Sequence, residues 1–150
     1  PVAMSWLVIA MQVGMWFGYV TFGYISDAVG RKRAYVAYLV TAAVLIAVYT
    51  SLRTPILLLL LGPFVAFFAT GYFSGFGAVT AEIYPTEIRA TAQGLTYNLG
   101  RIASAAAPFT VGTLAQTRGF DVALSTTSVA FVLAAVLWIW IPETKGRELA

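Results

Sequence analysis

Five apolar stretches separated by short polar connections constrain the fold of this chain most strongly. They cover about residues 2–26, 34–52, 55–81, 91–116 and 122–141. Only the fourth contains a charged side chain, Arg101. Each is close to or above the ~20 helical residues that cross a hydrocarbon core about 30 Å thick. Because lipid satisfies no backbone hydrogen bond, only helices or closed barrels span it, and these stretches lack the alternation of barrel strands. The predicted fold class is all-α, a polytopic transmembrane bundle of five helices.

Composition excludes several classes of protein. Hydrophobic residues make up 60% of the chain and charged residues 10%, whereas a soluble domain carries about 25% charged residues. The sequence contains no cysteine and no histidine, which removes the commonest nucleophiles, general bases and metal ligands. We therefore expect no catalytic residue, no metal, no cofactor and no enzyme activity. The net charge of +3 does not indicate nucleic-acid binding, because the basic residues lie in short connections between apolar stretches.

The basic residues also predict an orientation. If the connection that contains Arg31 is cytoplasmic, alternate crossings place six basic residues inside and two outside, with Arg101 in the membrane. The two groups are Arg31, Lys32, Arg33, Arg89, Lys145 and Arg147 against Arg53 and Arg118. The positive-inside rule then predicts an external Pro1 and a cytoplasmic C-terminus in the inner or plasma membrane. Because the chain starts at Pro1 and not at Met, we expect an upstream helix to be missing.

Small residues and prolines predict how the helices pack and bend. Gly14 and Gly18 in the first stretch, and Gly71 and Gly75 in the third, have the spacing that lets helix backbones approach closely in lipid. We interpret both pairs as packing sites and not as substrate contacts. Pro63 and Pro108 lie inside the third and fourth stretches, where each removes a backbone hydrogen bond and should bend its helix.

The connection after the first stretch has a distinctive pattern. Gly23 should permit close packing, Asp27 is suited to capping a helix or pairing with an arginine, and Gly30 permits a turn with positive φ. Three basic residues follow and hold the connection at the cytoplasmic surface. They are Arg31, Lys32 and Arg33. Taken alone, the pattern also fits an ordinary cytoplasmic loop.

The same pattern resembles the G-x-x-x-D-x-x-G-R-[RK]-[RK] loop of the major facilitator superfamily, which occurs once in each half of such transporters. Ala28 occupies a position that is often basic in that family. The segment 82–89 (EIYPTEIR) is similar to the family's E-x-x-P-T-x-x-R element between helices ten and eleven. The segment 142–146 (PETKG) is similar to the sequence that follows helix twelve in sugar porters and related members. These resemblances place the five stretches as helices eight to twelve, in a partial C-terminal half over residues 1–150.

The resemblance implies a twelve-helix carrier whose two halves rock around a small-molecule substrate, so the missing N-terminal half is an expected partner beside the lipid bilayer. It also implies a cytoplasmic charge network of Asp27, Arg31, Glu82 and Arg89 that stabilises the outward-facing state. From their positions alone, Glu82 and Arg89 could pair across their turn, and Thr86 could cap the next helix. The alternative is that these charges only anchor loops. The gate residues are Gly23, Asp27, Gly30, Arg31, Lys32, Arg33, Glu82 and Arg89.

Arg101 is the principal candidate for substrate binding. It lies ~15 Å along its helix from the cytoplasmic start, at a depth where an arginine is costly unless it faces protein or a water-filled cavity. Tyr97 and Asn98 share its helical face. We predict that its guanidinium binds a substrate carboxylate; the alternatives are an ion pair with the missing half or bonds to kinked backbone. Four weaker cavity candidates, which could equally be packing residues, are Gln12, Trp16, Tyr72 and Ser74.

The predicted function is secondary active transport of a small organic anion by proton-coupled symport through alternating access. A sugar has no use for a buried guanidinium, so Arg101 favours an anion over the alternative of a sugar or polyol. No acidic residue is predicted at mid-membrane depth, which leaves proton coupling open and places any main proton site in the missing half. A structural membrane protein is the alternative outside transport.

Overall fold

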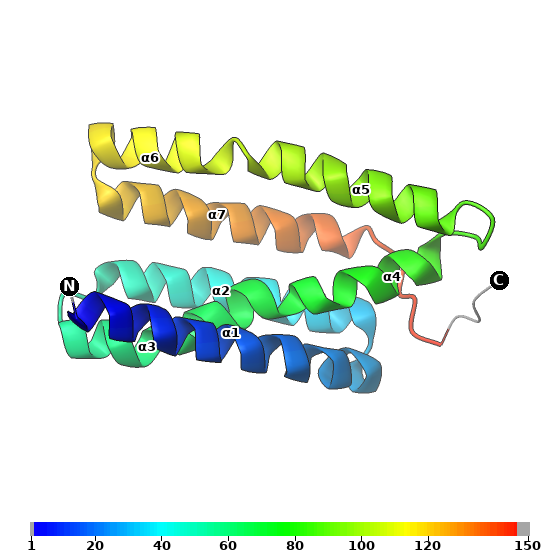
Figure 1. Cartoon of the computed structure of the whole chain (residues 1–150), viewed down its shortest axis with the longest axis horizontal. Helices are drawn as coiled ribbons and strands as arrows, with labels where there is room; N and C mark the ends of the chain where they lie inside the picture. Colours follow the sequence, from blue (N-terminus) through cyan, green and yellow to red (C-terminus); the bar gives the residue numbers. More distant parts are fainter. Residues whose placement is uncertain (1, 147–150) are drawn as a thin grey trace.

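The computed structural model describes residues 2–146, and over this range it contains helices and no strand (Figure 1). The helices run back and forth along one long axis. Their bounds are α1 Val2–Val29, α2 Arg31–Ser51, α3 Pro55–Gly71, the 3-10 helix η1 Tyr72–Gly75, α4 Phe76–Ile83, α5 Arg89–Ser104, α6 Ala107–Arg118 and α7 Phe120–Ile139. The predicted all-α class is confirmed.

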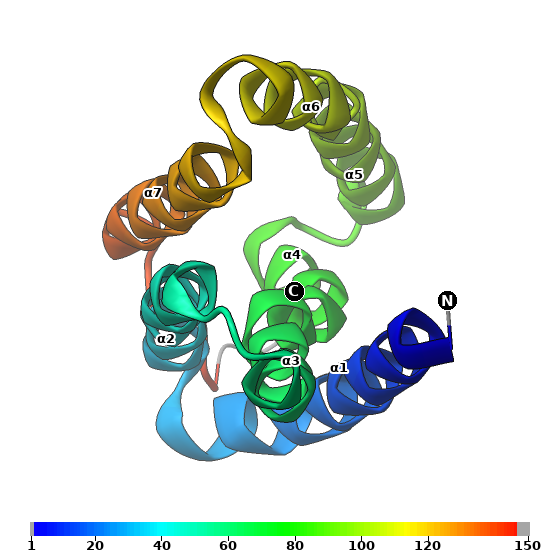
Figure 2. The same cartoon turned by 90° about the vertical axis from the view of Figure 1, so that its left-hand side faces the viewer.

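Figure 2 shows the arrangement of the helices in an end view. The path through α3, η1 and α4 runs through the middle of the bundle. Helix α1 packs along α3, while α2 packs against both α3 and α7. Helix α6 contacts α7, and α5 contacts α4 near the turn between them. Apart from these contacts, α5 and α6 lie away from α1, α2 and α3, and neither contains a buried residue.

Within the described residues 2–146, four helical segments are long and apolar enough to cross a membrane. They are Met4–Val29, Arg31–Ser51, Pro55–Ile83 and Phe120–Ile139. Most of their side chains are not covered by the rest of the chain, and large apolar side chains such as Trp16, Leu60 and Val132 are exposed. A surface of this kind is stable only in contact with lipid or further helices. The chain is therefore part of a multi-pass membrane protein.

The fourth stretch differs from the single helix expected over 91–116. It is divided into α5 and α6, which follow one another with a break at Ala105 and Ala106 (Figure 1). The Ala106 N–H turns back to the carbonyl of Ala103, 3.3 Å away, in a tighter turn than an α-helix makes. Pro108 explains the break, because it has no N–H to donate to the carbonyl of Ser104, four residues earlier, and its ring crowds that carbonyl. Pro108 thus stands in the first turn of α6.

The expected close packing of glycines is confirmed between α1 and α3. A Cβ atom on Gly14 would lie 2.1 Å from the carbonyl oxygen of Pro63, and one on Gly18 would lie 2.5 Å from that of Phe67. Only glycine permits these backbone contacts. A Cβ added to Gly23 would meet no atom of the described chain within 4 Å, so the close packing that Gly23 permits is not formed within residues 2–146.

The core of the bundle is aromatic. Tyr35 stacks on Trp138 of α7 with ring centroids 3.8 Å apart, and the edge of Phe22 meets both Tyr35 and Tyr38 at 4.9 Å. Phe22, Tyr35 and Tyr38 are at most 3% exposed. Such edge-to-face and stacked pairs add packing energy beyond the area they bury. They fix the side of α2 that faces inward, and hence the direction in which its first residues point.

Candidate functional site

Arg31, the first residue of α2, lies at the centre of a charge cluster at one end of the bundle. Its Nη2 donates to Oε1 of Glu82 at 3.0 Å, and its Nε donates to the same oxygen at 3.2 Å. Its Nη1 donates to Oγ of Ser26 at 2.8 Å and forms an ion pair with Asp27. The Arg31 and Glu82 side chains are only 15% and 12% exposed. This two-donor contact with one carboxylate uses the planar geometry that lysine lacks.

Glu82, at the end of α4, is shared with the segment that follows α7. Its Oε2 accepts a hydrogen bond of 2.5 Å from Oγ1 of Thr144, a residue that is fully buried. One carboxylate thereby joins Arg31 of α2 to Thr144. We call the group of Ser26, Asp27, Arg31, Glu82, Glu143 and Thr144 the Arg31 cluster.

Glu143 holds the N-terminus of α2. Its carboxylate accepts from the Arg31 N–H at 2.8 Å and the Lys32 N–H at 3.2 Å. It also accepts from the N–H groups of Thr144 and Lys145, at 3.1 and 3.2 Å. Desolvation acts to raise the pKa of Glu143, but the four backbone hydrogen bonds outweigh it and lower the pKa below its ordinary value of 4.5. A carboxylate at this place satisfies free N–H groups and the positive end of the helix dipole.

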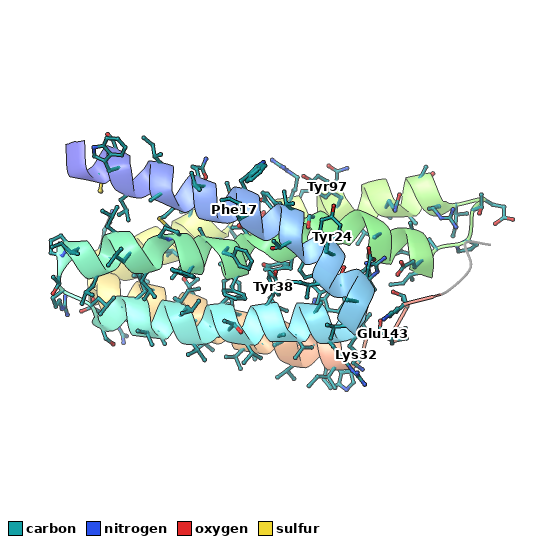
Figure 3. All side chains as sticks on the ribbon, turned by 90° about the horizontal axis from the view of Figure 1, so that it is seen from below. Phe17, Tyr24, Lys32, Tyr38, Tyr97 and Glu143 are labelled. Atoms are coloured by element: carbon teal, nitrogen blue, oxygen red, sulfur yellow. The ribbon has the colours of Figure 1, made fainter. Side chains whose placement is uncertain are left out.

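The turn between α1 and α2 is shaped for this contact. Gly30 has φ of 112°, as expected for the turn, and a Cβ there would lie 2.7 Å from Oε2 of Glu143. Two lysines bind the carbonyl ends of helices. Lys145 Nζ donates to the Ala28 carbonyl at the end of α1, at 2.6 Å, and Lys32 Nζ donates to the Ile139 carbonyl at the end of α7, at 2.5 Å. Cations at carbonyl ends of helices complement the dipole. Figure 3 shows Lys32 and Glu143 beside one another at this end.

The structure therefore gathers most, but not all, of the predicted gate residues. Asp27, Arg31 and Glu82 meet directly, and Gly30 and Lys32 flank them. Arg33 and Gly23 lie outside the cluster.

The turn between α4 and α5 differs from its expected arrangement. Glu82 bonds Arg31 and Thr144, and the Nε of Arg89 donates to the Tyr84 carbonyl at 3.2 Å. Thr86 was expected to cap the next helix, and this was wrong, because α5 begins later with Ile88 at its cap position.

Sequence reasoning did not select Ser26, Glu143, Thr144 or Lys145 as site residues. The signal was present in the resemblance of 142–146 to the P-E-T-K-G sequence, since four of those five residues are small or polar and directly follow an apolar stretch. What the sequence did not reveal is the position of this segment against the start of α2.

The Arg101 stripe is a separate polar feature on α5. Arg101 Nη1 donates to the Tyr97 hydroxyl at 3.1 Å, and its guanidinium carbon lies 5.7 Å from the centre of the Tyr97 ring. Asn98 instead donates to the Gly94 carbonyl of its own helix. All three side chains are exposed, and Tyr97 is labelled in Figure 3. Arg101 has no acidic partner within residues 2–146 and keeps free donors for an anion.

The four weaker candidates lie on α1 and η1. Gln12 and Trp16 are exposed on α1. Tyr72 packs among the core rings, and Ser74 donates to the Gly71 carbonyl at 2.9 Å, both within the 3-10 segment. Within residues 2–146, no hydrogen bond connects any of the four to Arg101. Nor does this range hold a group of three acidic side chains suited to a metal ion.

Comparison with known proteins identifies the family. The sequence profile described as "Major Facilitator Superfamily" matches residues 1–150. A "Putative metabolite transport protein" of Haemophilus influenzae is 36% identical over 95% of this chain and 34% of its own length. A "Putative niacin/nicotinamide transporter NiaP" of Bacillus subtilis is 36% identical over 95% of this chain and 36% of its own length. A "Probable 4-methylmuconolactone transporter" of Cupriavidus pinatubonensis is 31% identical over 93% and 33%, respectively.

The chain spans about a third of the length of these curated relatives. The match nevertheless covers it from end to end, including the three segments whose patterns resemble family elements. We conclude that this chain belongs to the major facilitator superfamily.

Proposed function

We propose that the chain is part of a secondary active transporter that moves a small organic anion across the inner or plasma membrane. Family membership and the relatives' names support this proposal. Niacin, which one name includes, is a carboxylate at neutral pH. In the proposal, the described helices are helices eight to twelve of a carrier that works by alternating access, with the N-terminal half completing the substrate cavity.

The observation that carries the substrate class is the exposed guanidinium of Arg101. An arginine on a membrane helix is stable only if it faces protein or water. Tyr97 holds it on one side through a hydrogen bond and its ring face. The remaining N–H donors suit the two oxygens of a carboxylate. A neutral sugar would leave this charge uncompensated.

In this proposal the Arg31 cluster lies on the cytoplasmic side and stabilises the outward-facing state. The contacts of the Arg31 cluster support a gate role. They join the ends of α1, α2 and α4 to the segment after α7, so that these elements move as one body. Asp27 is the exposed member, with a side chain that is 64% accessible, and can therefore also meet the other half. Asp27→Asn should shift the inward/outward balance in the full-length protein. Unchanged transport and an unchanged balance would disprove the gate role.

Uptake into liposomes by the full-length protein tests the substrate class. Nicotinate and nicotinamide form a matched pair that differs in charge. Arg101→Gln removes hydrogen bonds to a charged group, which are each worth roughly 1.5–3 kcal/mol, and should raise the KM for nicotinate by about tenfold or more. Arg101→Lys should also raise it, because lysine offers one point charge and no fork.

The control is Arg118→Gln, which removes the basic residue at the C-terminal end of α6, away from the Arg101 stripe. Uptake with and without an imposed pH gradient tests the proposed proton coupling. A normal KM for nicotinate in Arg101→Gln would overturn the role of Arg101. Saturable uptake of hexoses or polyols, with no carboxylate uptake, would instead support the sugar alternative that the 142–146 segment suggests.

A further inference from the structure

A groove of about 970 Å³ lies on the outer side of α2, at the same end as the Arg31 cluster. Its mouth is basic and its wall is apolar. Lys32, Arg33 and Lys145 line the mouth. The wall includes Val36, Ala37 and Val40 of α2. The transport proposal uses Glu143, one of the lining residues, but it assigns no ligand to the groove itself.

The mouth carries a net positive charge. Lys32 and Lys145 each give one hydrogen bond to a helix-end carbonyl, and each ammonium group has three donors, so both keep donors for an anion. Arg33 is exposed and has no hydrogen-bond or ion-pair partner among residues 2–146. Glu143 also lines the groove, but its carboxylate accepts four backbone N–H bonds. Three cations and one carboxylate leave two positive charges.

The wall continues the basic mouth along one face of α2. Arg33, Ala37, Val40 and Val44 are all exposed and follow one another at intervals of four, three and four residues. This spacing places them in a line on one helical face. The line from Arg33 to Val44 rises about 16 Å at 1.5 Å per residue. That is about half of a hydrocarbon core of ~30 Å, or the depth of one leaflet.

We propose that this groove binds an anionic phospholipid of the leaflet at the Arg31 end. The phosphate lies at the basic mouth, with Arg33 as its principal partner, and one acyl chain follows Val36, Ala37 and Val40. Basic pockets beside apolar helix surfaces on the cytoplasmic side are suited to such headgroups. The proposal shares its membrane orientation with the transport proposal, but it requires no transport activity.

Lipid binding is measurable by native mass spectrometry of the full-length protein in detergent, with phosphatidylglycerol and phosphatidylcholine of identical acyl chains. The wild type should bind phosphatidylglycerol more tightly. Each basic residue near an anionic headgroup increases the affinity for the lipid about fivefold. Arg33→Gln should therefore weaken phosphatidylglycerol binding by about that factor. Arg53→Gln, beyond the opposite end of α2, is the matched control and should change nothing. Because Arg33 is exposed and unpaired, its substitution should leave thermal unfolding unchanged.

A second pair of variants tests the apolar wall without changing charge. Ala37→Trp fills the groove and should weaken phosphatidylglycerol binding several-fold, whereas Val48→Trp, nearer the far end of α2, should not. Glycerol phosphate, which lacks acyl chains, should displace the lipid poorly. Equal binding of the two lipids, full binding by Arg33→Gln or Ala37→Trp, or equal competition by glycerol phosphate would each overturn the proposal.

Discussion

Charged pairs occur at both ends of the bundle, but they occupy very different environments. At one end, Arg31 and Glu82 are 15% and 12% exposed and share further partners in the Arg31 cluster. At the other end, Arg53 and Asp121 form a single contact of 2.7 Å between side chains that are 78% and 54% exposed. Distance alone would rank the exposed pair as the closer one. Because the Arg31–Glu82 pair is less exposed and has more partners, we nevertheless expect it to be the stronger of the two pairs.

The difference explains why only the Arg31 end can hold the helices in one arrangement. A buried pair stabilises one arrangement strongly, because loss of either partner leaves a charge without solvent or counter-ion. An exposed pair loses little when it opens, since water replaces the partner. Motion between helices should therefore be resisted at the Arg31 end and be easy at the Arg53 end.

The largest expected effect comes from Arg31→Gln. It leaves the Glu82 carboxylate, which is 12% exposed, without its cation, and this should destabilise the protein by about 3 kcal/mol, the lower end of the range for a fully buried pair. The matched variant Arg53→Gln should destabilise it by no more than about 1 kcal/mol. Thermal unfolding of the full-length protein in detergent, followed by tryptophan fluorescence, measures both. Similar falls in Tm for the two variants would contradict the contrast between the ends.

A second prediction compares the two glycine turns at these ends. Gly30 has φ of 112° and Gly119 has φ of 94°, and alanine in either backbone conformation costs about 1–3 kcal/mol. Gly30→Ala should destabilise more, because its Cβ would also lie 2.7 Å from Glu143, whereas a Cβ on Gly119 meets no atom of the described chain within 4 Å. The difference in Tm between the two variants isolates the Glu143 contact. Equal effects would mean that Glu143 moves away freely.

The smallest expected effect concerns Glu143 and pH. Because the pKa of Glu143 is lower in the folded protein than its ordinary value of 4.5, its contribution to stability is complete above that value. The contribution is lost as the pH falls through the lowered pKa. Glu143→Gln should therefore reduce stability near neutral pH, by about 0.5–1 kcal/mol as for other helix caps.

A pH series of Tm values tests this expectation. The wild type and Glu143→Gln should differ from pH 5 upward and converge only when the pH falls below the lowered pKa of Glu143, where the wild-type carboxyl becomes protonated. A constant difference over the whole series would show that the carboxylate charge contributes nothing to the cap.

The sequence predicted local features of the site better than distant ones. Asp27 and Arg31 are four residues apart across the Gly30 turn, so their closeness in the sequence alone favours the contact. The residues alone suggested that Glu82 could pair with Arg89, its neighbour across a turn, and only the family resemblance placed it in one network with Arg31, to which it bonds from 51 positions away. That contact depends on how α4 ends beside the start of α2, which no local pattern encodes.

The apolar stretches predicted helices well, because hydrophobicity summed over twenty residues outweighs local irregularities. They did not predict the 3-10 segment Tyr72–Gly75 or the interruption at Ala105 and Ala106 before α6. Pro108 indicated a bend, but whether a proline bends or divides a helix depends on whether neighbours hold the two halves in line. Helices α5 and α6 contain no buried residue and have little to hold them.

The contact between Glu143 and Arg31 joins residues 112 positions apart, and this has a consequence for biosynthesis. Arg31 and Glu82 leave the ribosome well before Glu143 and Thr144 are translated. During that interval the start of α2 lacks its carboxylate and Glu82 lacks its hydroxyl partner. The Arg31 cluster is complete only after α7 has entered the membrane. A nascent chain halted before residue 140 would therefore hold these helices without the contacts of Glu143 and Thr144.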